Sequence, residues 1–149
     1  MAEPAHGITI TRVFDAPRER IWKEWTEAEA FADWFGGGES EVPLSTVSMD
    51  VRAGGSWRLT MLADSGHREI HWKGEYREVL EPERLVFTIS DQPGEDAYEL
   101  ITVILTDLHD CRTEMVFRQS GTLPAEAYDR AKEGWSGFFD RIAERLADA

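Results

Sequence analysis

The chain has 149 residues, of which 42% are hydrophobic and 30% charged, and this composition fits one soluble globular domain of ordinary size. Its net charge of −13 works against nucleic acid and anionic membrane surfaces as partners, because phosphate binding needs clustered Lys and Arg. The sequence has no apolar run of membrane-spanning length, no secretory-signal pattern and a single cysteine, Cys111, so we expect a cytoplasmic protein without membrane insertion or an internal disulfide.

The first predicted element is a strand over residues 7–14, in which apolar and polar residues alternate. Ile8, Ile10 and Phe14 share one face of this strand, and Arg12 shares the same face by parity. Either a bulge changes the register, or Arg12 is partly buried and needs an acidic partner. We favour a structural ion pair over a role for Arg12 in ligand binding.

Two short helices are predicted next. The first begins at Asp15 or Ala16, and the second begins at Thr26, which forms a capping-box pattern with Glu29. Gly36 ends the second helix. The glycines at this point lack the Lys-Ser/Thr ending of a phosphate-binding loop and follow a helix, so we expect no role in nucleotide binding.

From Thr46 onward, alternating patterns predict six strands joined by short turns, and short turns imply antiparallel pairing. These strands cover residues 46–52, 56–63, 68–80, 84–90, 98–107 and 112–120.

The last predicted element is an amphipathic helix from Thr122 to Leu146, whose apolar stripe carries large aromatic residues. Gly134 and Gly137 lie inside this helix, where each costs about 1 kcal/mol relative to alanine. Gly134, at the edge of the stripe, permits either close packing on the sheet, which we favour, or room for a cavity beneath the helix. A curved seven-stranded antiparallel sheet around this helix, an α+β architecture, satisfies the whole pattern.

The sequence carries no pattern typical of a metal site, a cofactor site or a catalytic triad. His67 and His71 are four residues apart on a predicted strand, which separates them by roughly 13 Å, too far for one metal. Cys111 has no second cysteine in a CxxC motif, and no serine lies in a Gly-x-Ser-x-Gly motif. We therefore expect no cofactor and no metal.

A few polar residues lie on predicted faces that are otherwise apolar. Arg12, Glu99 and Gln119 are three of them, and Asp91 lies at a strand end. If these residues point inward, they orient a ligand in an apolar pocket, and Glu99 becomes a candidate general acid or base. If a bulge shifts the alternation of side chains along the strand, they face water instead. The candidate cavity residues are Trp34, Phe35, Trp57, Leu59, Met61, Trp72, Tyr76, Phe87, Glu99, Ile101, Met115, Phe117, Gln119, Gly134, Trp135 and Phe138.

Several short segments, in the same order along nearly the whole chain, carry a family resemblance. They are residues 12–22, 34–36, 50–57, 74–76, 81–85 and 134–135. Together they resemble proteins similar to the C-terminal domain of the Hsp90 ATPase activator. That family belongs to the START-related helix-grip superfamily, which also includes polyketide cyclases and lipid-transfer proteins.

The resemblance implies one START-like helix-grip domain over residues 1–149, with a curved sheet that encloses a mostly apolar cavity. It also implies small hydrophobic or amphipathic ligands as the common cargo. The co-chaperone of this family carries a separate N-terminal Hsp90-binding domain that this sequence does not include, so we expect no Hsp90-type chaperone as partner.

We therefore favour a non-catalytic or weakly catalytic protein that binds a small hydrophobic or amphipathic molecule, and the sequence leaves the natural ligand open. One alternative is a polyketide cyclase-like or hydrolase-like enzyme that uses Glu99 as an inward carboxylate. A second alternative is an Hsp90-type co-chaperone or a stress-related interaction module. The sequence also leaves open whether the protein forms a homodimer.

Overall fold

The computed structural model describes residues 7–35, 40–63, 66–91 and 98–147. Seven strands form one antiparallel sheet in the order β1-β7-β6-β5-β4-β3-β2. The strands are β1 (Gly7–Phe14), β2 (Ser48–Met49), β3 (Ser56–Ala63), β4 (Arg68–Leu80), β5 (Arg84–Ile89), β6 (Glu99–Asp107) and β7 (Thr113–Ser120). The predicted seven-stranded antiparallel sheet is confirmed.

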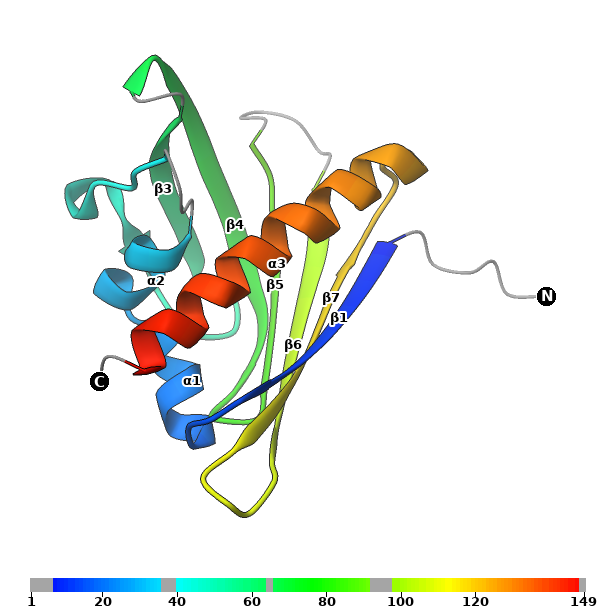
Figure 1. Ribbon diagram of the computed structural model, residues 1–149. Helices are drawn as coiled ribbons and strands as arrows, with labels where there is room; N and C mark the ends of the chain where they lie inside the picture. The colour runs from blue at the N-terminus through cyan, green and yellow to red at the C-terminus, as the bar shows by residue number, and fades with distance from the viewer. Residues whose placement is uncertain (1–6, 36–39, 64–65, 92–97, 148–149) are drawn as a thin grey trace.

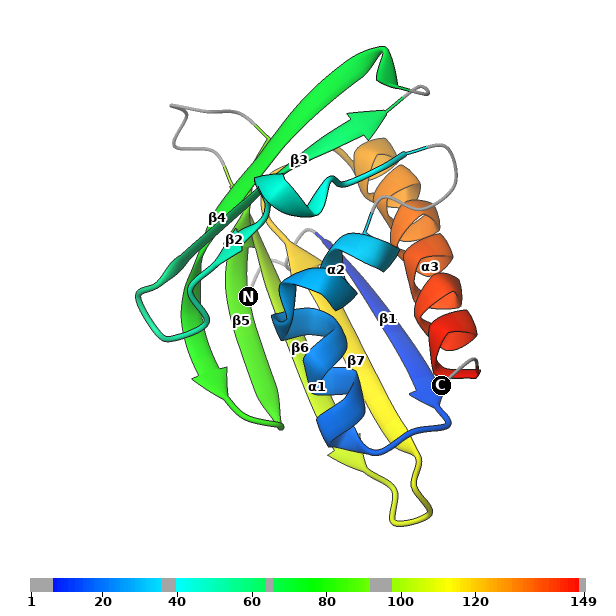
Figure 2. The ribbon, with the colours of Figure 1, turned by 90° about the vertical axis from the view of Figure 1, so that its left-hand side faces the viewer.

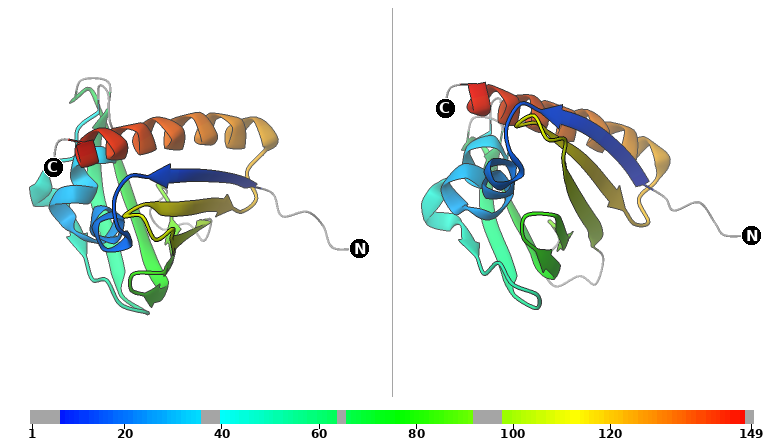
Figure 3. Two further views of the ribbon diagram at one scale, coloured as in Figure 1. Left: turned by 60° about the horizontal axis from the view of Figure 1, so that its bottom comes forward. Right: turned by 90° about the horizontal axis from the view of Figure 1, so that it is seen from below.

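The helices all lie on the concave side of this sheet. They are α1 (Arg18–Thr26) and α2 (Ala28–Trp34) after β1, the short 3-10 helix η1 (Leu44–Thr46), and the long C-terminal helix α3 (Ala125–Ala147). Helix α3 crosses the sheet diagonally, and α1 and α2 lie beside its C-terminal half (Figures 1 and 2). Seen from below, the sheet curls around all three helices (Figure 3). This is the predicted α+β helix-grip architecture.

Strand alternation decides which residues face the helices. On β6, Ile101 and Val103 are fully buried, and Thr102 between them is partly exposed. Val103 lies opposite Phe117 of β7, and Ile101 lies opposite Gln119. One face of each strand therefore supplies the apolar floor on which the helices pack, as the two-residue period requires.

An aromatic core fills the space beneath α1, α2 and the C-terminal half of α3. Trp25 of α1 is its centre: its ring lies 4.9 Å from that of Trp34, 6.1 Å from that of Phe117 and 6.0 Å from that of Phe139. These four side chains come from α1, α2, β7 and α3, and each is at most 1% exposed. This half of the concave face is therefore solidly packed.

Charged side chains attach the C-terminal half of α3 to its neighbours. The guanidinium of Arg145 contacts the buried carboxylate of Glu24 at 2.7 Å and also pairs with Asp33 of α2. Arg12 of β1 contacts Asp140 at 2.8 Å, and its side chain is 27% exposed. The expected structural ion pair of Arg12 is confirmed, and its partner is an acidic residue of α3.

The start of the second helix was predicted wrongly. Thr26 is the last residue of α1, where its hydroxyl donates to the carbonyl of Trp22 at 2.8 Å. Glu27 is the N-cap residue of α2 and makes no side-chain capping bond. The hydroxyl is used inside the first helix, so the capping box does not form. Gly36 and the rest of residues 36–39 lie outside the described residues.

The strand predicted over residues 46–52 is also mostly wrong. The chain forms η1 at Leu44–Thr46 and then only the two-residue strand β2. The Thr46 hydroxyl donates to the carbonyl of Pro43 at 2.7 Å and accepts from the backbone N–H of Thr60 at 3.1 Å. A helical turn fixed by a side-chain hydrogen bond thus replaces the start of the strand.

Helix α3 begins at Ala125 rather than at the predicted Thr122, because the carbonyl of Pro124 accepts the first backbone hydrogen bonds of its opening turn.

Gly74 of β4 tests how closely the sheet is packed. A Cβ atom at this position would lie 1.7 Å from the carbonyl oxygen of Thr88, which also accepts the indole N–H of Trp57 at 3.0 Å. We expect Gly74→Ala to lower the free energy of unfolding by about 1–3 kcal/mol, measured by urea denaturation. Gly137→Ala is the control, because a Cβ there meets nothing within 4 Å, and should raise it by about 0.5–1 kcal/mol. Full stability in Gly74→Ala would contradict this packing.

Candidate functional site

A cavity of about 550 Å³ lies between residues 131–138 of α3 and the sheet. The strands contribute side chains near the end of the sheet where β5 stops, β6 begins and β7 stops, and Phe35 comes from the segment after α2. The lining residues are Phe35, Met61, Trp72, Ile89, Ser90, Asp91, Tyr98, Glu99, Gln119, Thr122, Leu123, Ala131, Gly134, Trp135 and Phe138.

The floor and the rim of this cavity are both apolar. Phe35, Ile89 and Trp135 belong to the buried core, so they form a fixed floor. Tyr98 and Leu123 line the same cavity yet are 49% and 38% exposed, which makes them two of the large hydrophobic side chains that the protein leaves in contact with water. Exposed apolar groups at the mouth of an apolar cavity suit the entry of an apolar molecule.

A hydrogen-bonded chain of side chains forms the polar wall. The indole N–H of Trp135 donates to Gln119 Oε1 at 2.8 Å, and Gln119 Nε2 donates to Glu99 Oε1 at 3.2 Å. The backbone N–H of Thr122 donates to Glu99 Oε2 at 3.3 Å. Gln119 is only 5% exposed, so its amide is held in one orientation by these two bonds.

Tyr128 supports this wall from α3. Burial, together with the nearby carboxylate of Glu99, raises the pKa of Tyr128. The phenol therefore stays protonated at neutral pH, and its oxygen accepts the backbone N–H of Leu123 at 3.2 Å. The first turn of α3 is thereby tied to the segment that precedes it.

Gly134 lies at the mouth of the cavity rather than against the sheet. A Cβ atom built at this position meets nothing within 4 Å, and the residue is one of those that line the cavity. The favoured interpretation, close packing of the helix on the sheet, is therefore wrong. The missing side chain leaves open space beside the cavity.

The structure divides the predicted cavity residues into two equal groups. The group that lines the cavity is Phe35, Met61, Trp72, Glu99, Gln119, Gly134, Trp135 and Phe138. The other group lies in the core, where no residue is more than 3% exposed: Trp34, Trp57, Leu59, Tyr76, Phe87, Ile101, Met115 and Phe117. For this second group the prediction is wrong, because Trp25 and its neighbours fill the space that a cavity would need.

Sequence reasoning also missed part of the lining. Ile89, Ser90 and Tyr98 flank the connection between β5 and β6, while Leu123 and Ala131 belong to the start of α3 and the segment before it. The signal available was position along the strands: Glu99 is the first residue of its strand, and Gln119 is the last but one of its own. Paired antiparallel strands bring such positions to the same end of a sheet. Asp91 does line the cavity, whereas Arg12 does not.

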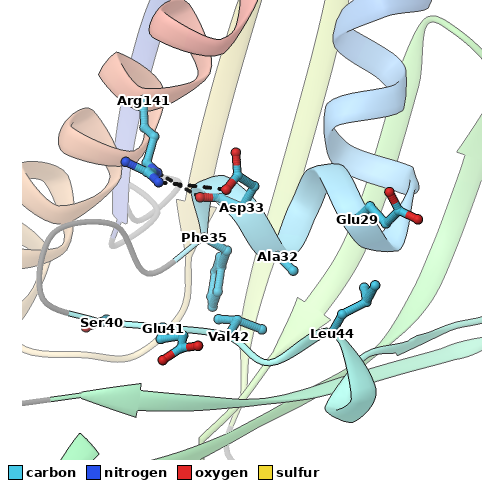
Figure 4. Close-up of a pocket in the computed structure, with 9 residues that line it drawn as sticks. All are labelled: Glu29, Ala32, Asp33, Phe35, Ser40, Glu41, Val42, Leu44 and Arg141. Carbon is cyan, nitrogen blue, oxygen red and sulfur yellow. Dashed lines mark hydrogen bonds and ion pairs between the residues drawn. The ribbon is translucent and has the colours of Figure 1, made fainter. Parts of the chain in front are cut away.

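A second hollow lies on the other side of Phe35, between α2 and residues 40–44 (Figure 4). Its volume is about 360 Å³, and its lining includes Glu29, Asp33, Glu41 and Arg141. Arg141 donates to the backbone carbonyl of Asp33 at 2.7 Å and lies 3.8 Å from its carboxylate. Three carboxylates and one guanidinium line this hollow, so it suits an apolar ligand poorly.

Within residues 7–35, 40–63, 66–91 and 98–147, no three His, Cys, Asp or Glu side chains gather in an arrangement that would hold a metal ion. His71, for example, contacts Thr60 at 3.1 Å and Glu69 at 3.5 Å on the exposed face of the sheet. None of the described helices is both long enough and apolar enough to cross a membrane.

Residues 15–147 match the family described as activator of Hsp90 ATPase homolog 1-like protein. The chain belongs to this family. The resemblance inferred from the sequence segments is thus confirmed, and the match includes every described strand except β1, the three α-helices and the residues that line the cavity. No curated protein matches the chain in sequence.

Solved structures share the fold of this family member. A protein from Chromobacterium violaceum is 25% identical, with a TM-score of 0.80 over 93% of this chain and 94% of its own. An AHSA1 protein from Silicibacter pomeroyi is 19% identical, with a TM-score of 0.82 over 95% and 97%. An Hsp90 activator from Plasmodium falciparum is 21% identical, with a TM-score of 0.73 over 95% and 96%. At these identities, the last two similarities show the fold alone.

The polar wall makes a prediction about stability. Gln119→Met removes both side-chain hydrogen bonds and leaves the buried indole N–H of Trp135 without its acceptor. We expect the free energy of unfolding, measured by urea denaturation, to fall by about 1–3 kcal/mol. Ser120→Met, at the next position on the opposite face of β7, should change it by less than about 0.5 kcal/mol. Equal stability of the two variants would show that the wall contributes nothing.

Proposed function

We propose that this protein binds a small hydrophobic or amphipathic molecule in the cavity between α3 and the sheet. The observation that carries the proposal is the composition of that cavity: nine of its fifteen lining residues are apolar, and its few polar groups lie together on one wall. Its volume of about 550 Å³ also falls within the range typical of small-molecule sites, roughly 300–1,000 Å³.

The binding energy would come mainly from removing apolar ligand surface from water. Burying roughly 300 Å² of such surface contributes about 7 kcal/mol before the cost of association is subtracted. A dissociation constant in the micromolar range or weaker is therefore expected for a simple apolar probe. The hydrogen-bonded wall around Glu99 and Gln119 would orient the polar end of an amphipathic ligand.

The geometry favours binding over catalysis. Both carboxylate oxygens of Glu99 accept hydrogen bonds, from Gln119 Nε2 and from the backbone N–H of Thr122. A carboxylate whose two oxygens are held in this way is a rigid acceptor, which suits orientation of a ligand. The Plasmodium falciparum relative is an Hsp90 activator, but a role in chaperone activation would use the surface of the protein rather than this cavity.

Gly134→Leu tests the proposal directly, because a side chain at this position would project into open space at the mouth of the cavity. The probe is the neutral dye N-phenyl-1-naphthylamine, followed by its own fluorescence and by quenching of tryptophan fluorescence. We expect the wild type to bind this dye and Gly134→Leu to weaken its affinity by about tenfold, which corresponds to about 1.4 kcal/mol of lost contact.

Gly137→Leu is the matched control, because it makes the same change on the same helix at a position that does not line the cavity. It should bind the dye as the wild type does. Circular dichroism and the thermal midpoint should show that both variants fold. Equal weakening in both variants, or no binding of the dye to the wild type, would count against the cavity as a ligand site.

A further inference from the structure

The charged side chains among the described residues that line the cavity are all acidic. The lining residues include two carboxylic acids, Asp91 and Glu99, and the described part of the lining includes no Lys, Arg or His. The two acids follow and begin neighbouring strands: Ile89, at the end of β5, pairs with Glu99, the first residue of β6. Both therefore lie at the same end of the sheet, on the same wall of the cavity.

The carboxylate of Glu99 is fixed and retains capacity to accept a further hydrogen bond. A Cβ atom at Gly121 would lie 1.8 Å from Glu99 Oε2, so the carboxylate lies directly against the main chain. Two neutral donors hold it: Gln119 Nε2 and the backbone N–H of Thr122. An ionised carboxylate offers about four acceptor sites, so about two sites stay open to a donor.

The charged groups around this wall do not cancel its charge from inside the cavity. No ion pair between described residues includes Asp91 or Glu99. Arg118, next to Gln119 on β7, donates to Thr9 at 2.9 Å, and its charge also acts on the phenol of Tyr128, but it does not line the cavity. Arg77 contacts the rim residue Tyr98, with its guanidinium 5.3 Å from the ring centre, but does not line the cavity.

We propose that the cavity selects amphiphiles by their head group: it takes an apolar tail attached to a hydrogen-bond donor that is cationic, such as a primary ammonium, and disfavours carboxylate, sulfate and phosphate head groups. This inference rests on the proposed function. An ammonium group donates to an open acceptor site of Glu99 and is attracted by both carboxylates. An anionic head group finds no cation among the described residues that line the cavity, and it loses hydration beside two like charges.

The test uses three ten-carbon probes with the same tail: decylamine, decanol and decanoate. Each competes with N-phenyl-1-naphthylamine for the wild-type protein at pH 7 and about 150 mM salt, where the net charge of the whole protein is largely screened. We expect decylamine to displace the dye at a concentration about tenfold lower than decanoate, with decanol between them.

Three variants locate the origin of the preference. Glu99→Gln should remove most of the difference between decylamine and decanoate. Asp91→Asn should reduce it, and because this side chain is exposed, the variant should fold even if Glu99→Gln does not. Glu114→Gln is the control, because it makes the same change of charge on the outer face of β7, which does not line the cavity. It should leave the preference intact.

The possible results separate this inference from the proposed function. Equal displacement by decylamine and decanoate overturns the head-group preference and leaves the proposed function standing. A preference that survives in both Glu99→Gln and Asp91→Asn also overturns it, because the attraction would then come from the overall negative charge. If the wild type binds neither the dye nor any of the three probes, the proposed function itself fails.

Discussion

One constraint governs this structure: α3 crosses the concave face of a seven-stranded sheet but does not pack against that face along its whole length. The C-terminal half of α3 is held against α1, α2 and β1 by the buried pair of Arg145 with Glu24 and by the pair of Arg12 with Asp140. Trp25 fills the space beneath that half. The opposite end of the sheet receives no such filling, and the cavity lies there, beneath residues 131–138.

The polar wall satisfies part of the hydrogen-bonding capacity around this opening. An empty space in a core loses packing energy, and a buried polar group without a partner costs still more. The indole N–H of Trp72, which lines the cavity, is such a group among the described residues. The indole of Trp135, in contrast, donates to Gln119, and Gln119 donates to Glu99, which also accepts the backbone N–H of Thr122 just before α3. The chain of bonds ties the helix, β7 and β6 together at the cavity. Its carboxylate is also the feature that would distinguish one polar head group from another.

Most of the architecture was predictable from the sequence, because apolar residues recur with a different spacing in strands than in helices. Parity placed Arg12 on the inner face, and the structure supplies its acidic partner. The failures come from choices that periodicity does not encode. The hydroxyls of Thr26 and Thr46 donate to carbonyls in their own helical turns. As a result, the predicted capping box of the second helix does not form, and the strand predicted from Thr46 is replaced at its start by a helical turn. Which aromatic residues line the cavity depends on where the side chain of Trp25 packs, and the sequence pattern does not encode this. Gly134 was compatible with close packing or with open space, and only coordinates distinguish the two.

The most direct test of the account asks where an apolar molecule goes. The six tryptophans can be labelled with 5-fluorotryptophan, and their fluorine NMR signals assigned by single Trp→Phe variants. Addition of N-phenyl-1-naphthylamine is predicted to shift the signals of Trp72 and Trp135, which line the cavity, and to leave those of Trp22 and Trp57 unchanged. Unshifted signals from Trp72 and Trp135, or shifts confined to the other tryptophans, would contradict the claim that the space beneath α3 is a binding site.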